Sequence, residues 1–263
     1  MAIGTISNGE SGLSVRTKLN LTIDHANAGM ANRVVVKTAS QLAGTLSSTT
    51  QYFLDGIIDM GSTSIEIPVG GLFIAGYNFD QSGLTSSANT FTLFTSPVGG
   101  SGNVLFDNFL IDVSGTGSQV YNLVSDTGNE AIEVDRINYN NCTSLGTIDN
   151  YRQGLEQGTG RFGGTPNLTL KGIWVGGFRI TTSIVRNLAV GMTGALFQAG
   201  VGFRMDSRFL SDINCDLPAS AALFDFASSQ FPNSSTLQMI GAIISRDGVI
   251  DASDTNLTPN IDC

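Results

Sequence analysis

Acidic residues are the part of this chain best suited to catalysis, and several lie close together in the sequence. The candidate pairs are Asp107 with Asp112, Glu130 or Glu133 with Asp135, and Asp206 with Asp212. A glycoside hydrolase needs two carboxyl groups about 5 to 9.5 Å apart beside a groove. Glu133 and Asp135 would project from one face of a strand. Each acid nevertheless stands near Asn, Gly or Ser, where carboxylates commonly cap turns, so the sequence favours structural roles and identifies no catalytic residue.

Two other kinds of catalysis have weaker support. A polysaccharide lyase would also need a basic residue near its acids, and Arg136, Arg204 and Arg208 are available for that role. The single histidine, His25, lies in a polar segment near the N-terminus, outside the repeated part of the chain. A catalytic triad built on histidine is therefore not expected.

Two apparent binding signatures also lack the context that they need. Gly158, Gly160 and Gly163 have the spacing of a dinucleotide-binding fingerprint, but a polar segment precedes them in place of a strand and Gly-Thr-Pro follows in place of a helix. Trp174, the only tryptophan, lies at the centre of an alternating strand. It is predicted to be a core or inter-subunit residue rather than a platform for a sugar.

The segment of residues 146–166 interrupts the repeated pattern and shows little alternation. It is predicted to leave the body of the protein as a loop, and such loops commonly carry binding residues. The loop would contact either a receptor or a neighbouring subunit. Its candidate contact residues are Tyr151, Arg152, Glu156, Arg161 and Phe162.

A repeated phrase indicates the elements that would position these residues. A short alternating strand, a break at Asn, Asp or Gly, and a second apolar run recur at residues 103–113, 131–142, 167–183, 203–215 and 236–250. The spacing is irregular and lacks helical periodicity, which excludes ankyrin and tetratricopeptide repeats. A parallel β-helix tolerates such variation because loops of any length can leave at its corners. The predicted fold is therefore all-β, a right-handed single-stranded parallel β-helix (solenoid) with an extended N-terminal arm.

The composition supports this fold and argues against some classes of binding partner. Charged residues make up 13% of the chain, against about 25% in typical proteins, and 32 glycines supply turns, so long helices are not expected. Hydrophobic residues make up 41% of the chain, enough for a sizeable core. The net charge of −9 would repel nucleic acid and anionic membranes.

Cysteine usage and the N-terminus give further expectations. Cys142, Cys215 and Cys263 are too few and too widely spaced for a disulfide framework or a zinc site, and Cys142 and Cys215 are predicted to be buried free thiols. No metal and no cofactor is expected. The first residues lack a secretory signal and no run of 18 apolar residues occurs, so synthesis in a cytoplasm without general secretion is expected.

The chain divides into three predicted parts. Residues 1–32 form an arm interrupted by glycines. Residues 33–52 form a terminal cap, in which Ser40 would cap a helical turn through Leu42 and Leu46. Residues 53–263 form the parallel β-helix, beginning with three short strands between residues 53 and 74.

Two stretches resemble the fibre and tailspike proteins of tailed bacteriophages. Residues 6–20, ISNGESGLSVRTKLN, resemble the N-terminal segment that attaches such proteins to the virion, and residues 34–80 resemble the first coils of their β-helices, including the Ile-Pro-x-Gly-Gly-Leu step into a strand. The resemblance implies that the arm is a virion anchor. Its residues would be Gly9, Glu10, Gly12, Val15, Arg16, Lys18 and Leu19.

The resemblance also implies a function. It implies a homotrimeric structural fibre or adhesin, located in the virion, that binds other virion proteins and presents its β-helix to the host surface, where a glycan is one candidate receptor. Two alternatives stay open: a tailspike enzyme that degrades polysaccharide, and a purely structural decoration of the head or tail.

Overall fold

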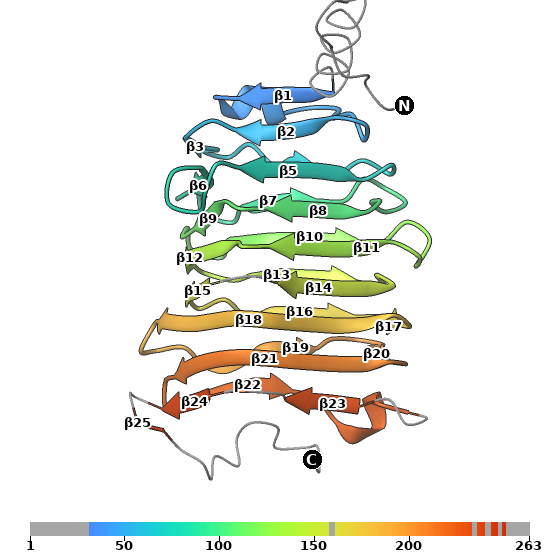
Figure 1. Cartoon of the computed structure of the whole chain (residues 1–263), viewed down its shortest axis with the longest axis vertical. Helices are drawn as coiled ribbons and strands as arrows, with labels where there is room; N and C mark the ends of the chain where they lie inside the picture. The colour runs from blue at the N-terminus through green and yellow to red at the C-terminus, as the bar shows by residue number, and fades with distance from the viewer. Residues whose placement is uncertain (1–31, 158–160, 233–235, 240–242, 247–248, 251–263) are drawn as a thin grey trace, which may run out of the picture.

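The computed structural model describes residues 32–157, 161–232, 236–239, 243–246 and 249–250. Within these residues the regular elements are strands and two short 3₁₀ helices, with no α-helix. The strands cross the longest axis of the molecule and stack along it (Figure 1). The prediction of an all-β chain is confirmed. No helix in the described part is long and apolar enough to span a membrane.

The largest sheet has two sides that join in one long strand. The first side contains β1 (Arg33–Val36), β2 (Gln51–Leu54), β5 (Leu72–Gly76), β8 (Val104–Asp107), β11 (Ala131–Asp135) and β14 (Gln153–Gln157). The second side contains β3 (Ile57–Asp59), β6 (Gly83–Ser86), β9 (Leu110–Val113), β12 (Asn138–Cys142) and β15 (Arg161–Gly164). Both sides continue into β18 (Gly177–Leu188), β21 (Arg208–Leu217), β23 (Thr236–Met239), β24 (Ile243–Arg246) and β25 (Val249–Ile250).

A second sheet lies opposite. It contains β4 (Ile65–Glu66), β7 (Thr92–Thr95), β10 (Gln119–Val124), β13 (Gly146–Asp149), β16 (Leu168–Lys171), β19 (Gly194–Ala199) and β22 (Ala221–Asp225). The remaining strands, β17 (Ile173–Trp174) and β20 (Arg204–Met205), pair with each other. Every pair of named strands is parallel except β24 with β25. The parallel pairs join strands of successive repeats and are therefore not hairpins.

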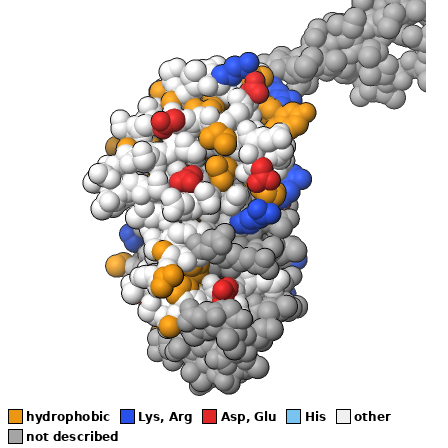
Figure 2. All heavy atoms as spheres, turned by 90° about the vertical axis from the view of Figure 1, so that its left-hand side faces the viewer, with side chains coloured by type: hydrophobic (Ala, Val, Ile, Leu, Met, Phe, Trp, Pro, Cys, Tyr) orange, Lys and Arg blue, Asp and Glu red, His pale blue; other side chains and the backbone are white. Residues whose placement is uncertain are grey.

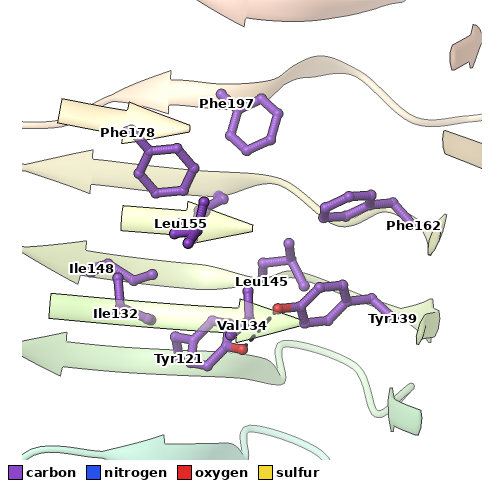
Figure 3. A pocket seen from close by; sticks show the side chains of 11 residues that line it. Tyr121, Ile132, Val134, Tyr139, Leu145, Ile148, Leu155, Phe162, Phe178 and Phe197 are labelled. Carbon is purple, nitrogen blue, oxygen red and sulfur yellow. Dashed lines mark hydrogen bonds between the residues drawn. The ribbon is translucent and has the colours of Figure 1, made fainter. Parts of the chain in front are cut away.

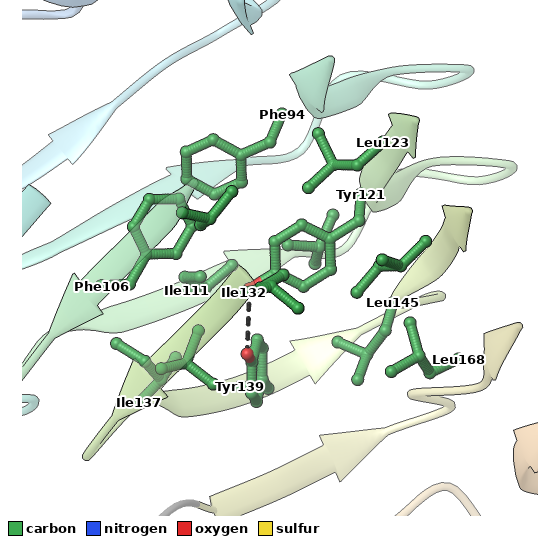
Figure 4. Close-up of a cluster of buried hydrophobic side chains, with 14 of the residues drawn as sticks. Phe94, Phe106, Ile111, Tyr121, Leu123, Ile132, Ile137, Tyr139, Leu145 and Leu168 are labelled. Carbon is green, nitrogen blue, oxygen red and sulfur yellow. Dashed lines mark hydrogen bonds between the residues drawn. The ribbon is translucent and has the colours of Figure 1, made fainter. Parts of the chain in front are cut away.

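In-register pairing places similar side chains above one another. One inward row runs through Leu72, Val104, Ile132, Gly154 and Phe178 on consecutive strands. The core lies between the two sheets and is rich in aromatic rings, as Figure 4 shows for one cluster. There the ring centroids of Phe94 and Phe106 lie 4.6 Å apart. Such contacts add to the stability gained by burying apolar surface.

The prediction that residues 146–166 form a loop is wrong. These residues contain β13, β14 and β15, which pair within the two sheets. Glycines in this segment replace apolar residues, so the sequence does not show the alternation of apolar and polar residues that is typical of strands. Gly154 occupies an inward position, and a Cβ atom there would lie 2.3 Å from Cδ2 of Phe178. The ring of Phe178 fills the space of the missing side chain, so no apolar residue is needed at this position of β14.

The predicted helical turn near the N-terminus is present as η1 (Ala39–Leu42), with Leu42 and Leu46 buried as expected. Ser40 lies inside η1 and does not cap it. The N-cap is Thr38, and the side-chain oxygen of Gln41 accepts hydrogen bonds from the backbone N–H of Lys37 (2.7 Å) and of Thr38 (3.1 Å). The second 3₁₀ helix is η2 (Ser228–Gln230).

Three predictions about single residues are confirmed. Cys142 and Cys215 are buried free thiols. Burial raises the pKa of Cys142 to about 12. Trp174 is fully buried, and its ring nitrogen donates a hydrogen bond of 2.8 Å to the backbone oxygen of Lys171.

Candidate functional site

The outer face of the first side of the large sheet carries a mixed row of apolar and charged residues. The register places Phe73, Leu105, Glu133, Leu155 and Arg179 at equivalent positions of β5, β8, β11, β14 and β18. Leu105 keeps 43% of its surface exposed. Two shallow grooves follow this row, and Leu155 lines both. We call them the acidic half and the basic half.

The acidic half is a groove of about 210 Å³ over β8 and β11. Its lining residues are Phe73, Leu105, Phe106, Asp107, Glu133, Val134, Asp135 and Leu155. Asp107 and Asp135 are paired in register on neighbouring strands, whose backbones lie about 4.8 Å apart. Two carboxylates at this distance repel each other unless a cation lies between them.

Arg136 supplies that cation. Its Nη2 lies 2.7 Å from Oδ1 of Asp107, and its Nε lies 3.3 Å from Oδ2 of Asp135. Burial raises the pKa of the Asp135 carboxyl, an effect that Arg136 opposes and Asp107 reinforces. The hydrogen bond from Arg136 to Asp107 in turn raises the pKa of Arg136. Arg136 adopts a left-handed backbone conformation with φ of 54°, which directs its side chain within reach of both acids.

The basic half is a larger groove of about 490 Å³ over β14, β18 and β21. Its lining residues are Gln153, Gly154, Leu155, Gly176, Gly177, Phe178, Arg179, Ser207 and Arg208. Arg179 and Arg208 are exposed, and among the described residues neither has an acidic group within salt-bridge distance. Gly176 and Gly177 project no side chain into the groove.

Of the candidate acid pairs, Glu133 and Asp135 project from one face of β11, as the sequence predicts, and both line the acidic half. Asp107 and Asp112 lie on β8 and β9, which belong to different sides of the sheet. Asp112 instead accepts a hydrogen bond of 2.8 Å from Nδ2 of Asn140, and burial raises its pKa.

Asp206 pairs with Arg204, whose Nε lies 2.6 Å from Oδ1 of Asp206. The side chain of Asp212 lies outside the described residues.

Glu130 holds its own loop together. Its carboxylate accepts hydrogen bonds from the hydroxyls of Ser125 and Thr127 and from the backbone N–H groups of Thr127 and Asn129. Burial raises its pKa, but these hydrogen bonds outweigh burial and lower the pKa to about 2. This matches the expectation that acids of the chain cap turns.

The five predicted contact residues are not one surface. Tyr151 is buried, and its hydroxyl lies 2.7 Å from Oγ of Ser101. Burial raises its pKa to about 12. Phe162 is also buried, with its ring stacked 5.1 Å from that of Tyr139. Neither side chain can therefore meet a partner at the surface.

The other three predicted contact residues have different environments. Arg152 and Arg161 are exposed. The guanidinium of Arg161 lies 4.8 Å from the ring centre of Phe79. For Glu156 only the backbone is described, in β14. The predicted anchor residues of the arm, with His25 and Cys263, lie outside the described residues.

The grooves on the sheet face were missed because their residues are far apart in sequence. One signal was available, since the strand ends Val-Leu-Phe-Asp and Ile-Glu-Val-Asp align Asp107 with Asp135. Figure 2 views the side on which β3, β6, β9 and β12 lie and shows charged and hydrophobic side chains scattered among the white atoms of other side chains and the backbone.

An interior cavity is unsuitable for a ligand. It holds about 20 Å³, room for about one water molecule, and is lined mainly by apolar side chains such as Ile132, Leu145 and Phe197 (Figure 3). In the described part of the chain, no group of three or more Asp, Glu, His or Cys side chains could hold a metal ion.

Comparison of the chain with protein-family models, with curated proteins and with solved structures found no match to any of them.

Proposed function

We propose that this chain is a structural fibre or adhesin of a tailed-bacteriophage virion, in which a right-handed single-stranded parallel β-helix presents a surface to the host. The observation that carries the proposal is the stack of parallel strands along the longest axis, with a groove on one face of the stack. A continuous core holds such a stack rigid. The resemblance of residues 6–20 and 34–80 to phage fibres is the reason for placing the chain in a tailed-phage virion.

The proposal includes assembly and anchoring. Three copies would associate, since phage fibres of this kind are generally trimers, and the arm of residues 1–32 would attach the trimer to another virion protein. The low charge content of the chain, 13%, supports contact between copies because few charges would need to be desolvated. Light scattering in native buffer should give the mass of three chains, and a stable monomer at micromolar concentration would contradict the trimer.

The location is tested with an antibody. Virions of the phage that encodes this chain should be labelled at the tail tip, baseplate or head by an antibody raised against residues 33–232. Unlabelled intact virions that lack the chain by mass spectrometry would overturn the proposal. The position of the label also separates a receptor-binding fibre from a decoration of the head.

The anchor is tested by charge reversal. The double substitution Arg16→Glu and Lys18→Glu should leave the trimer intact, because both residues precede the first strand, yet it should reduce incorporation into virions about tenfold or more through lost charge complementarity. Mass spectrometry of purified virions measures the copy number. A wild-type copy number would show that these cations are not the anchor.

A polysaccharide-degrading tailspike is the second candidate, favoured by the Asp107–Asp135 pair in a groove. Burial also raises the pKa of Asp135, as the acid of a glycosidase requires. Against the enzyme, Arg136 contacts both carboxyl groups and so engages them within the chain. A reducing-end assay on host polysaccharide should show no release. Release abolished by Asp135→Asn, with the trimer retained, would establish the enzyme instead.

A further inference from the structure

We propose that the basic half is a binding site for an anionic saccharide chain, in which Arg179 and Arg208 hold carboxylate groups of acidic sugars. The inference rests on the proposed attachment function and names the chemical class of its ligand. It is carried by two arginines that line one groove and have no ion-pair partner among the described residues, in a chain that is acidic overall.

Location in one groove, together with the lack of a partner among the described residues, sets these arginines apart, since Arg152 also lacks a described partner but does not line the groove. Arg136 and Arg204 form ion pairs with aspartates. Arg33 lies over the ring of Phe53 at 3.8 Å, and Arg161 lies over another ring. Arg179 and Arg208 have no such partner among the described residues, and both line one groove. The chain has 22 acidic residues and 13 basic ones. Because acids outnumber bases, most arginines of the chain are expected to have an acid nearby.

The register shows why the described acid of the outer row, Glu133, does not pair with Arg179. Arg179 follows Leu155 in the outer row, and Glu133 precedes Leu155. Glu133 and Arg179 are therefore two strands apart, about 9.6 Å between backbones, and no ion pair joins them in the described part of the chain. Leu155 separates them with an apolar side chain. The positive charge of the basic half thus stays available to a ligand.

The spacing of the two arginines suits an extended ligand. Arg179 pairs with Leu210, and Arg208 lies two residues earlier on the same strand, β21. Neighbouring strands lie about 4.8 Å apart and alternate residues about 6.6 Å apart, so the two backbones are about 8 Å from each other. Two guanidinium groups at this separation can hold two carboxylates of one chain, each by paired hydrogen bonds.

The remaining lining fits sugar rather than a globular partner. The groove volume of about 490 Å³ is typical of small-ligand sites. Gly176 and Gly177 keep it open, and a Cβ atom on Gly177 would lie 2.5 Å from the backbone oxygen of Arg208. Gln153 and Ser207 offer neutral donors and acceptors to hydroxyl groups, and Leu155 offers an apolar contact to a ring face.

The test uses titration calorimetry on the full chain in its native assembly. The probe is an octamer of galacturonic acid, and the matched neutral probe is an octamer of maltose-type glucose units. We expect binding of the acidic octamer only, weakening as salt is raised from 50 to 300 mM. Arg179→Gln with Arg208→Gln should weaken this binding at least tenfold.

A control variant carries the same loss of charge. Lys37→Gln with Arg204→Gln removes two cations outside the groove, each paired with an aspartate at the surface. Binding should be within a factor of two of wild type. Equal loss in both double variants would show that net charge alone attracts the octamer and would overturn the site. Circular dichroism and light scattering of each variant confirm that fold and assembly are retained.

Other results of these experiments also distinguish the binding site from the fibre proposal. Binding of the neutral octamer alone, or of neither octamer, overturns the inference, and virion labelling by antibody would leave the fibre proposal intact. Binding of the acidic octamer to a chain absent from virions would uphold the site and overturn the fibre. If the Arg179 and Arg208 variant changes the number of associated copies without changing octamer binding, the basic half is a contact between copies.

Discussion

The acidic and basic halves lie side by side on one sheet face but differ in how their charges are satisfied. In the acidic half, Arg136 contacts both Asp107 and Asp135. In the basic half, Arg179 and Arg208 have no acidic partner among the described residues. Charges neutralised within the chain hold the surface in shape. Charges left free are available to a ligand, so the comparison assigns structural support to one half and binding to the other.

The layers beneath the two halves differ as well. Phe106 and Val134 lie under the acidic half, in a row that has full side chains. Under the basic half, Gly154 leaves space that the ring of Phe178 occupies. The packing beneath the basic half therefore depends on the fit of the Phe178 ring against Gly154.

The largest expected effect comes from breaking that fit. Phe178→Ala should lower the free energy of unfolding by about 3 to 5 kcal/mol, because its ring also packs on Trp174 and Phe209. Gly154→Ala alone should cost about 1 to 3 kcal/mol through overpacking. In the double mutant the added methyl has room, so the loss should be smaller than the sum of the two. Urea denaturation measures all three, and strict additivity would contradict the fit.

A smaller effect is expected at the loop that leads into the acidic half. The folded pKa of Glu130, about 2, lies below its ordinary value of 4.5. Its stabilisation is therefore complete above about pH 5 and is lost as pH falls from 4.5 towards 2. Glu130→Gln should cost about 1 kcal/mol at pH 7, allowing for solvent screening, and nearly nothing at pH 2.

Denaturation of wild type and Glu130→Gln across this pH range measures the difference. Asp126→Asn, at an exposed acid of the same loop, is the control and should cost less stability at pH 7 than Glu130→Gln. A gap between wild type and Glu130→Gln that stays constant from pH 7 to pH 2 would falsify the role of the ionised carboxylate.

The smallest expected effect is a difference in stability between substitutions of the two aspartates of the acidic half. Asp107→Asn removes the closest acceptor of Arg136 and should lower stability by about 0.5 to 1 kcal/mol at pH 7. Asp135 has a folded pKa above its unfolded value, so its contribution is present below about pH 4 and is lost as pH rises through the folded pKa. Asp135→Asn should therefore change stability by less than about 0.5 kcal/mol. A greater loss for Asp135→Asn than for Asp107→Asn contradicts this order.

The sequence was sufficient to predict the class of fold but not every strand. Alternation with breaks at Gly and Asn predicted strands, and these form in parallel sheets. Prediction failed at residues 146–166, where Gly154 stands at an inward position that Phe178 fills from the next strand. A pattern of apolar residues within one strand cannot report a side chain supplied by another.

The grooves were harder to predict because they depend on register. Asp107 and Asp135 could have been aligned from the sequence, since each ends a similar strand segment, Val-Leu-Phe-Asp and Ile-Glu-Val-Asp. In the structure each also precedes a residue with positive φ, Asn108 at 64° and Arg136 at 54°. The proximity of Arg179 and Arg208 had no such signal. It depends on the length of the connection between β18 and β21, and strand patterns do not determine that length.

Backbone hydrogen bonds between neighbouring strands run along the longest axis, because the strands themselves cross that axis (Figure 1). Force applied along this axis therefore loads the stacked strand pairs in series. Such a structure opens first at its weakest pair, so the force that it withstands is set by that pair rather than by the sum of all pairs. Compression has the opposite effect, since it presses the stacked rings of the core together.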